Sequence, residues 1–211
     1  METSNRKVGR TRHMAVSLVL MLSGLCAAPS FAGTNSERFE GWTVEQGVEP
    51  PSYAVIDPVS TNLNVDTVVL ACEQAEDGKV LQLHIYLSTE GPLSPKGVAP
   101  RQLKDDPGAE IVVDGRVFPV GILFADIYAV LADGTKGMFP LLSEPLLDAM
   151  ATGKTMVLRF DLVAERAGQP RAFDGEVVIA LQAGAGGAAV AAVRRCAEAD
   201  IRPSAVAYAQ H

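Results

Sequence analysis

The stretch from Lys154 to Cys196 limits the possible folds more than any other part of the chain. It predicts a strand over Thr155–Leu162, a loop, a second strand over Glu176–Leu181, a glycine-rich turn and a closing helix over Ala188–Ala199. Each strand carries apolar residues that need a partner surface, because a strand turns alternate side chains to opposite faces. We therefore expect the upstream chain to supply further sheet on which this unit packs.

The clearest upstream strand is Val80–Ser88, where apolar and polar side chains alternate. The two sets are Leu81, Leu83, Ile85 and Leu87 on one face, and Gln82, His84 and Tyr86 on the other. This period of two predicts one buried face and one face in water. The apolar run Thr67–Cys72 precedes this strand, and Glu76-Asp77-Gly78 supplies a turn between them, so the two runs form a predicted hairpin.

Other short apolar runs, bounded by turn residues, predict further strands. These runs are Phe39–Val44, Tyr53–Ile56, Ile111–Phe118 folded about a turn at Asp114-Gly115, Ile122–Phe124, Ile127–Leu131 and Met138–Leu142. The segments Ser60–Asp66 and Gly91–Pro107 are expected loops. Ser143 is the expected N-cap of a short helix, Glu144–Met150, that Gly153 ends. The pattern predicts a mainly β fold: an antiparallel β-sandwich or barrel-like domain with two short helices, one near the carboxy terminus.

The first 32 residues are typical of an export signal. They combine the basic residues Arg6, Lys7, Arg10 and Arg12, the apolar run Met14–Ala28, and small residues in Ser30-Phe31-Ala32. The apolar run is short for a bilayer span, which takes about 20 residues. We expect cleavage after Ala32 and a periplasmic or secreted product without a stable membrane span; an uncleaved amino-terminal anchor is the alternative. Residues 33–203 would form one β-rich domain, and residues 204–211 a flexible tail.

The net charge limits the possible binding partners, and the cysteines indicate a disulfide. Loss of residues 1–32 removes four of the 18 basic and one of the 25 acidic side chains, which leaves a net charge of about −10. A chain this acidic lacks the positive surface that binds nucleic acid or an anionic membrane. Cys72 and Cys196 remain, and an oxidising compartment favours a disulfide between them. Two buried free thiols are the alternative.

No motif predicts a catalytic, cofactor or metal site. Gly184–Ala189 follows a strand and opens a helix, as a dinucleotide-binding turn does, but the chain ends 22 residues later, before such a sheet could be completed. These glycines are better explained by close packing of the helix. Zinc binding and nucleophilic catalysis need histidine or cysteine at defined spacing, and the mature chain has only His84 and His211 as histidines. A carboxylate pair brought together by the fold remains open.

Four landmarks resemble those of small exported proteins of Proteobacteria. They are Trp42-Thr43-Val44, the run Thr67–Cys72, a helix followed by Gly153–Phe160, and a final strand, glycine turn and helix that carries Cys196. On these residues the chain resembles the invasion-associated locus B family and the VasI-type proteins linked to type VI secretion. The resemblance covers most of the mature chain and implies a non-enzymatic envelope protein.

Three functions are consistent with these observations. The first is a periplasmic, non-enzymatic protein that binds another envelope protein through an exposed apolar patch or a sheet edge. The second is a small-molecule or glycan-binding protein, which needs a cleft where polar groups and aromatic rings converge; Trp42 and four tyrosines are the aromatic residues with polar tips. The third is a carboxylate-based hydrolase, which needs a carboxyl pair in a groove with a raised pKa.

Overall fold

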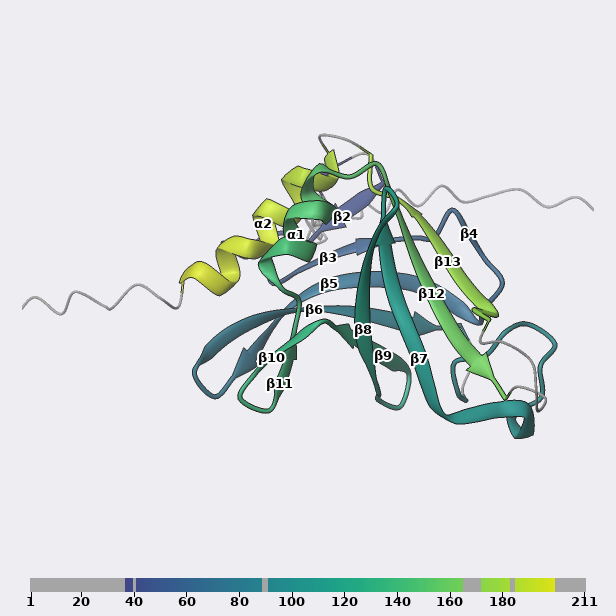
Figure 1. Cartoon of the computed structure of the whole chain (residues 1–211). Helices are drawn as coiled ribbons and strands as arrows, with labels where there is room; N and C mark the ends of the chain where they lie inside the picture. Colours follow the sequence, from purple (N-terminus) through teal and green to yellow (C-terminus); the bar gives the residue numbers. More distant parts are fainter. Residues whose placement is uncertain (1–36, 40, 89–90, 165–171, 183–184, 200–211) are drawn as a thin grey trace, which may run out of the picture. The chain divides into compact units, whose positions relative to one another are not determined.

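A computed structural model describes residues 37–39, 41–88, 91–164, 172–182 and 185–199 (Figure 1). All of these residues lie in the compact unit Thr34–His211. The expected signal segment, residues 1–32, and the expected tail, residues 204–211, lie outside the described residues. Within the part of the chain that is described, no helix is long and apolar enough to cross a bilayer.

Eleven strands form one antiparallel sheet that curls into a half-barrel (Figure 1). In pairing order they are β1 (Glu37–Phe39), β2 (Trp42–Val44), β3 (Tyr53–Ile56), β5 (Val65–Ala75), β6 (Gly78–Leu87), β9 (Tyr128–Ala132), β8 (Arg116–Phe124), β7 (Leu103–Val113), β12 (Thr155–Val163), β13 (Gly175–Ala180) and β4 (Ser60–Thr61). The strands β10 (Gly134–Lys136) and β11 (Phe139–Leu141) pair separately, and a short 3-10 turn, η1 (Pro100–Gln102), precedes β7. The predicted mainly β, antiparallel, barrel-like fold is confirmed.

Two helices, α1 (Glu144–Thr152) and α2 (Ala185–Ala199), pack against each other at one end of the sheet (Figure 1). Ser143 caps α1 as predicted, since its Oγ accepts a hydrogen bond from the Leu146 N–H at 3.4 Å. The close packing expected of the glycine-rich turn is also present. A Cβ on Gly187 would lie 2.5 Å from the carbonyl oxygen of Ala151 in α1, so a larger residue at this position would separate the two helices.

Several strand boundaries differ from the prediction. The expected single strand Phe39–Val44 is the β1–β2 hairpin, because Gly41 adopts a φ of +102° and reverses the chain. The expected loop Ser60–Asp66 contains β4, and the expected loop Gly91–Pro107 contains the first part of β7. The two strand segments expected on either side of Pro119 are one continuous strand, β8.

Pro119 fits inside β8 without loss of a hydrogen bond in the ladder. The β7–β8 hairpin closes with the predicted two-residue turn, in which Asp114 and Gly115 both have positive φ. Hydrogen-bonded and non-hydrogen-bonded pairs alternate from that turn, so Pro119 and Glu110 form a non-hydrogen-bonded pair. The ring nitrogen of Pro119 therefore points away from β7, towards the side on which β9 lies. Because β9 pairs with β8 only from Gly121 onwards, no hydrogen bond is lost on that side either.

The segment between β3 and β5 joins the far end of the sheet, because β4 pairs with β13. Asn62 extends this contact through its side chain: Nδ2 donates to the Asp174 carbonyl at 2.8 Å, and Oδ1 accepts from the Glu176 N–H at 2.7 Å. Leu63 is fully buried beside Gly175, where an added Cβ would lie 2.7 Å from the Leu63 Cδ2 atom. We call this contact of Asn62 and Leu63 with the start of β13 the seam.

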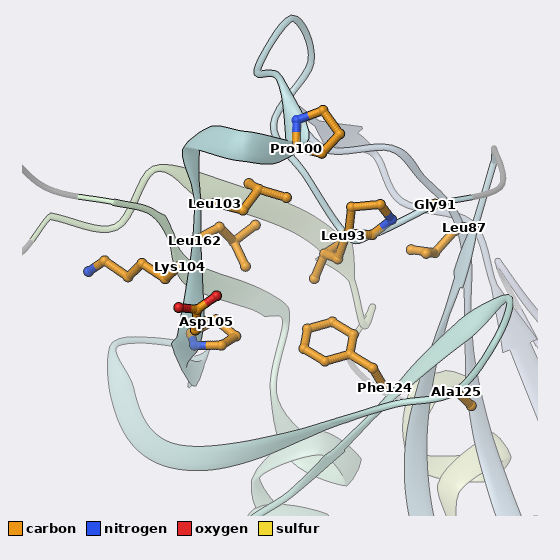
Figure 2. A pocket seen from close by; sticks show the side chains of 12 residues that line it. Leu87, Gly91, Leu93, Pro100, Leu103, Lys104, Asp105, Phe124, Ala125 and Leu162 are labelled. Carbon is orange, nitrogen blue, oxygen red and sulfur yellow. The ribbon is translucent and has the colours of Figure 1, made fainter.

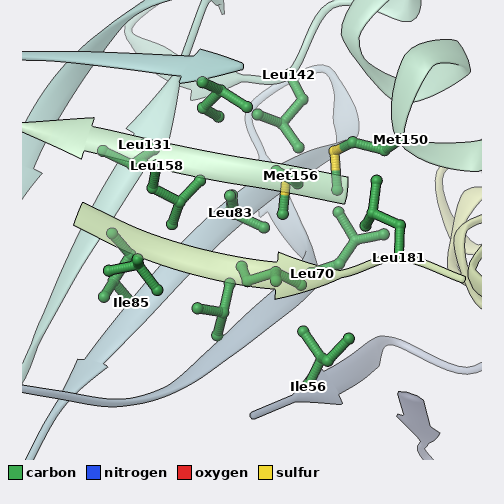
Figure 3. Packing of buried hydrophobic residues seen from close by; sticks show 14 of the residues in the cluster. Ile56, Leu70, Leu83, Ile85, Leu131, Leu142, Met150, Met156, Leu158 and Leu181 are labelled. Carbon is green, nitrogen blue, oxygen red and sulfur yellow. The ribbon is translucent and has the colours of Figure 1, made fainter. Parts of the chain in front are cut away.

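A continuous apolar core fills the inside of the curled sheet (Figure 3). Ile56 of β3, Leu83 of β6 and Leu158 of β12 all point into it, and Met150 enters from α1. Trp42 of β2 is fully buried in the same core. Because side chains occupy the interior, any binding surface has to lie at an end of the half-barrel or on its outside.

The centre of β6 is buried on both faces, and the predicted wet face is therefore wrong there. Gln82 and His84 are only 6% and 4% exposed. Gln82 Nε2 donates to the Pro140 carbonyl of β11 at 2.8 Å, and the Tyr128 ring of β9 stacks on His84 with centroids 4.9 Å apart. The β10–β11 hairpin and a ring from the neighbouring strand thus cover this face, which alternation within one strand could not reveal.

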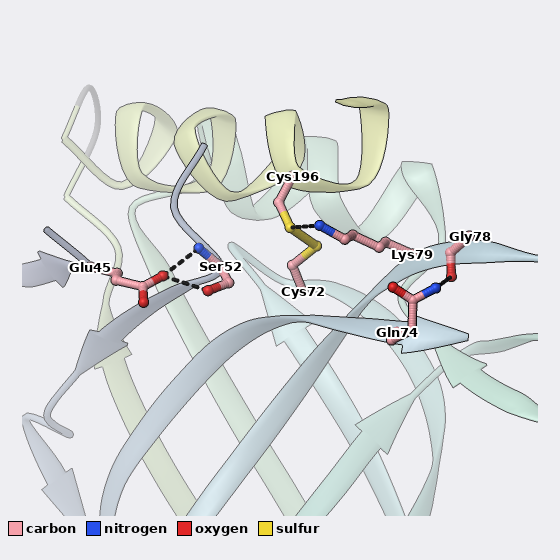
Figure 4. The surroundings of a disulfide bond; sticks show 7 residues. All are labelled: Glu45, Ser52, Cys72, Gln74, Gly78, Lys79 and Cys196. Carbon is pink, nitrogen blue, oxygen red and sulfur yellow. Dashed lines mark hydrogen bonds between the residues drawn. A yellow bond between two sulfur atoms is a disulfide. The ribbon is translucent and has the colours of Figure 1, made fainter. Parts of the chain in front are cut away.

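Cys72 of β5 and Cys196 of α2 lie together as predicted, with their Sγ atoms 2.27 Å apart and their Cα atoms 6.3 Å apart (Figure 4). These distances correspond to a disulfide rather than to two free thiols. Lys79 Nζ lies 3.6 Å from Cys196 Sγ. The bond joins residues 124 positions apart and fastens α2 to the sheet.

Reduction of the Cys72–Cys196 disulfide should lower the free energy of unfolding by about 3–5 kcal/mol, because a long closed loop strongly restricts the unfolded chain. Urea denaturation with and without a reductant measures the change. The double variant Cys72→Ala, Cys196→Ala is the matched control, since a reductant should not affect it further. Two alkylatable thiols in the unreduced protein would contradict the prediction.

Acidification below pH 6.5 should destabilise the fold through His84. Burial holds the pKa of His84 below its ordinary value of 6.5, and the nearby Glu73 carboxylate opposes part of that shift. The unfolded chain then binds a proton that the folded chain does not, so the stabilisation present above pH 6.5 is lost as the pH falls through the lowered folded-state pKa. The slope from this one proton is at most about 1.4 kcal/mol per pH unit.

Urea denaturation at a series of pH values between about 7.5 and 5.5 checks this dependence on His84. The His84→Asn variant keeps a polar side chain but has no proton to bind, so its stability should vary less over the range. Equal pH dependence of the parent and the variant would show that His84 is not responsible.

Candidate functional site

An apolar pocket of about 430 Å³ opens at the end of the half-barrel away from the helices. We call it the mouth. It is lined by Leu87 at the end of β6, Leu93 in the following loop, Leu103 of β7, Phe124 of β8 and Leu162 of β12. Figure 2 shows the Phe124 ring directed into the pocket, across from Leu103, Leu162 and Leu93. Five segments of the chain therefore contribute apolar surface to one opening.

The alternation of β8 places Phe124 in the mouth. Phe118, Val120, Ile122 and Phe124 lie on the same face of this strand, and Phe118 is buried in the core. Phe124, at the end of the strand, is 52% exposed. The core-facing side of β8 thus continues beyond the core and leaves half of a large aromatic side chain in water.

A bulge in β7 forms another wall of the mouth. Asp161 of β12 pairs with Gly108, whereas Val163 pairs with Leu103, so residues 104–107 loop out between the two pairs. Lys104 Nζ and Asp161 Oδ1 form an ion pair at 2.5 Å, and both side chains are largely buried. This ion pair fastens the bulge to β12 and keeps the wall in place.

More exposed apolar surface lies at the β8–β9 turn, where Ile127 and Leu123, which is on the opposite face of β8 from Phe124, are both more than half exposed. The turn has a defined backbone: the Ala125 N–H donates to the Tyr128 carbonyl at 2.8 Å, and the Leu87 N–H donates to the Ile127 carbonyl at 3.0 Å. Exposed apolar side chains on a well-defined backbone are typical of an interaction site.

The charged side chains around the mouth are mainly acidic. Asp105 lines the pocket, Asp106 follows it, and Asp126 lies next to Ala125 in the β8–β9 turn; all three aspartates are exposed. Arg101, in η1, is an exposed cation nearby. The balance of charge at this rim favours a partner that carries positive charge beside its apolar surface.

The residues singled out in the sequence do not lie at the mouth. Cys72 and Cys196 lie at the helix-covered end of the sheet. The carboxylate of Asp114 accepts hydrogen bonds from the Lys154 and Thr155 N–H groups, which hold its pKa below the ordinary value, the opposite of what a hydrolase acid requires. Among the described residues, no group of three or more His, Cys, Asp or Glu is placed to hold a metal ion.

The residues that line the mouth were not predicted from the sequence. Leu93 and Leu103 lie in the segment Gly91–Pro107, which its prolines and glycines marked as a loop. The large apolar residues in that segment could have indicated a pocket, because a loop that is fully exposed to water seldom contains them.

Searches of protein families, of curated proteins and of solved structures find no match to this chain. The function of the mouth is therefore inferred from its own geometry. Its apolar walls and acidic rim supply contact area and charge, which are the means of binding a partner.

The mouth should bind a neutral apolar dye, and the exposed ring of Phe124 should account for much of that binding. The Phe124→Ser variant should lower Nile red fluorescence while reducing the free energy of unfolding by only about 1 kcal/mol, because half of the side chain already lies in water. The matched control is Met138→Ser, which removes an 86% exposed apolar side chain from the β10–β11 hairpin. Equal dye binding by the two variants would contradict the assignment.

Proposed function

We propose that this chain is an exported, non-enzymatic protein that binds another protein of the cell envelope through the mouth. The exposed apolar pocket with its half-exposed Phe124 is the observation that carries this proposal. Export to the periplasm or the outside is supported by the signal-like first 32 residues and by the Cys72–Cys196 disulfide, which persists in an oxidising compartment. The resemblance to the invasion-associated locus B and VasI-type proteins is consistent with this role.

The dimensions of the mouth suit a protein anchor. A pocket of about 430 Å³ has room for one or two large apolar side chains, and a buried apolar anchor commonly supplies most of the energy of an interface. Ile127, whose carbonyl accepts a hydrogen bond from the N–H of the lining residue Leu87, would extend the contact beyond the pocket. The partner is expected to present an apolar side chain flanked by lysine or arginine, because Asp105 lines the mouth, the exposed Asp106 and Asp126 are each next in sequence to a lining residue, and the whole chain carries a net charge of −7.

A small apolar molecule is the second candidate occupant. The volume of the mouth lies within the range of small-molecule sites, and its lining is mainly apolar with Lys104 and Asp105 at the edge. This occupant would need no extended surface, so Ile127 would contribute little to its binding.

A photo-crosslinking amino acid placed at position 124 in intact cells tests the proposal, with position 138 as the matched exposed control. We expect one envelope protein to crosslink from position 124 and not from position 138. The purified partner should then bind the Phe124→Asp variant at least about tenfold more weakly than the parent, because loss of a central anchor costs 1.4 kcal/mol or more. Its affinity should also fall as the salt concentration rises.

The outcomes separate the candidates. Crosslinking of the same proteins from both positions, or an unchanged affinity of the Phe124→Asp variant, would contradict the proposal. A small molecule that co-purifies with the parent and is lost in Phe124→Asp, without a protein crosslink, would favour the second candidate.

A further inference from the structure

A second hollow lies on the face of the sheet that points away from the core, over β3, β5 and β6. Val69 and Ala71 of β5 form its floor, Tyr53 of β3 forms one wall, and His84 and Tyr86 of β6 form the other. Tyr53 is directly opposite Ala71, and Val69 is directly opposite His84. Two strand spacings, about 10 Å, separate β3 from β6. Along the strands, Tyr53 lies across from Gln82 of β6, which is two residues from His84 and four from Tyr86. The hollow has a volume of about 440 Å³ and shares no lining residue with the mouth.

Tyr128 of β9 supports the wall that β6 provides. Its ring stacks on His84 with centroids 4.9 Å apart and on Tyr86 with centroids 5.3 Å apart. β9 lies on the opposite side of β6 from β5, so Tyr128 holds the two rings from behind while they border the hollow. The hollow thus has well-supported aromatic walls and a floor of smaller side chains.

The hydrogen bonds of Gln82 determine which nitrogen of His84 carries a proton. Gln82 Nε2 donates to the Pro140 carbonyl, and this fixes the orientation of the amide. Gln82 Oε1 then faces His84 Nε2 at 3.0 Å, and because an amide oxygen only accepts, His84 Nε2 carries the proton. Burial lowers the pKa of His84, so the ring is neutral near pH 7 and its Nδ1 is a hydrogen-bond acceptor.

The polar atoms of the hollow favour a neutral ligand that donates hydrogen bonds. Glu73 of β5 borders the hollow two residues beyond Ala71, and the lining residues include no lysine or arginine. The carboxylate repels anions, and together with His84 Nδ1 it accepts from hydroxyl or amide groups. A pyranose ring has hydroxyl groups around its edge and C–H faces that pack against aromatic rings, so it matches both the walls and the acceptors.

We propose that this hollow binds a neutral carbohydrate chain. One sugar unit of the chain packs its C–H face against an aromatic ring of the hollow, one hydroxyl group of the chain donates to His84 Nδ1, and another donates to Glu73. This site goes beyond the protein-binding role of the mouth and does not depend on it, because the two share no lining residue. A glycan and a partner protein can therefore be bound at the same time.

Calorimetric titration of the full chain with hexasaccharides tests the proposal. The probes are maltohexaose, cellohexaose and chitohexaose, with hexagalacturonate as the anionic comparison. We expect at least one neutral hexasaccharide to bind and the anionic one not to bind. Tyr53→Ala and Glu73→Gln should each weaken binding about tenfold or more, whereas Tyr53→Phe, which keeps the ring, and the mouth variant Phe124→Asp should bind as the parent does.

Nitrogen-15 NMR of the His84 ring gives a readout that a purely structural role would not change. Nε2 should appear protonated and Nδ1 unprotonated, and the Nδ1 resonance should shift when the sugar binds. The proposal is overturned if no neutral hexasaccharide binds, if hexagalacturonate binds equally well, or if Tyr53→Ala and Glu73→Gln bind like the parent. Loss of binding in Phe124→Asp would place the sugar at the mouth and would also overturn it.

Discussion

The half-barrel depends on the seam, where the segment between β3 and β5 is fastened to the start of β13. A two-residue strand such as β4 supplies little on its own, but Asn62 adds hydrogen bonds from both ends of its amide, and Leu63 is fully buried against Gly175. The hydrogen bonds of Asn62 and the burial of Leu63 therefore stabilise the same contact. The seam acts together with the β4–β13 pairs and with the hydrogen bond from the Val59 N–H to the Val178 carbonyl at 2.8 Å to hold this edge of the sheet against β13.

The core determines where the protein can bind other molecules. Apolar side chains from the sheet and the helices occupy the inside of the curl, so the structure does not offer the open interior of a ligand-carrying barrel. The two hollows to which we assign binding roles differ in chemistry: the mouth is apolar with an acidic rim, while the hollow over β3, β5 and β6 combines aromatic walls with the acceptors of Glu73 and His84. They lie on different parts of the sheet, which allows one small domain to have two binding roles.

The sequence was informative where local chemistry determines structure. The Asp114-Gly115 turn and the Ser143 cap followed from residue type and spacing, and the pairing of Cys72 with Cys196 followed from the presence of two cysteines after the expected signal segment. It was less informative where a distant element decides the environment of a residue. His84 is buried because Tyr128 covers it from another strand, and the mouth unites segments from five parts of the chain. Periodicity within one strand contains no information about such neighbours.

The seam also determines when the protein can fold. It joins residues that lie more than 110 positions apart in the chain, as the 112-residue separation of Asn62 and Asp174 shows, and the disulfide spans 124 positions. Contacts between distant residues form slowly, because a long loop must close before they contribute to stability. A chain still lacking Gly175 and the residues after it can form hairpins but cannot close the half-barrel, and it exposes strand edges and core residues to aggregation until its last sixth is complete.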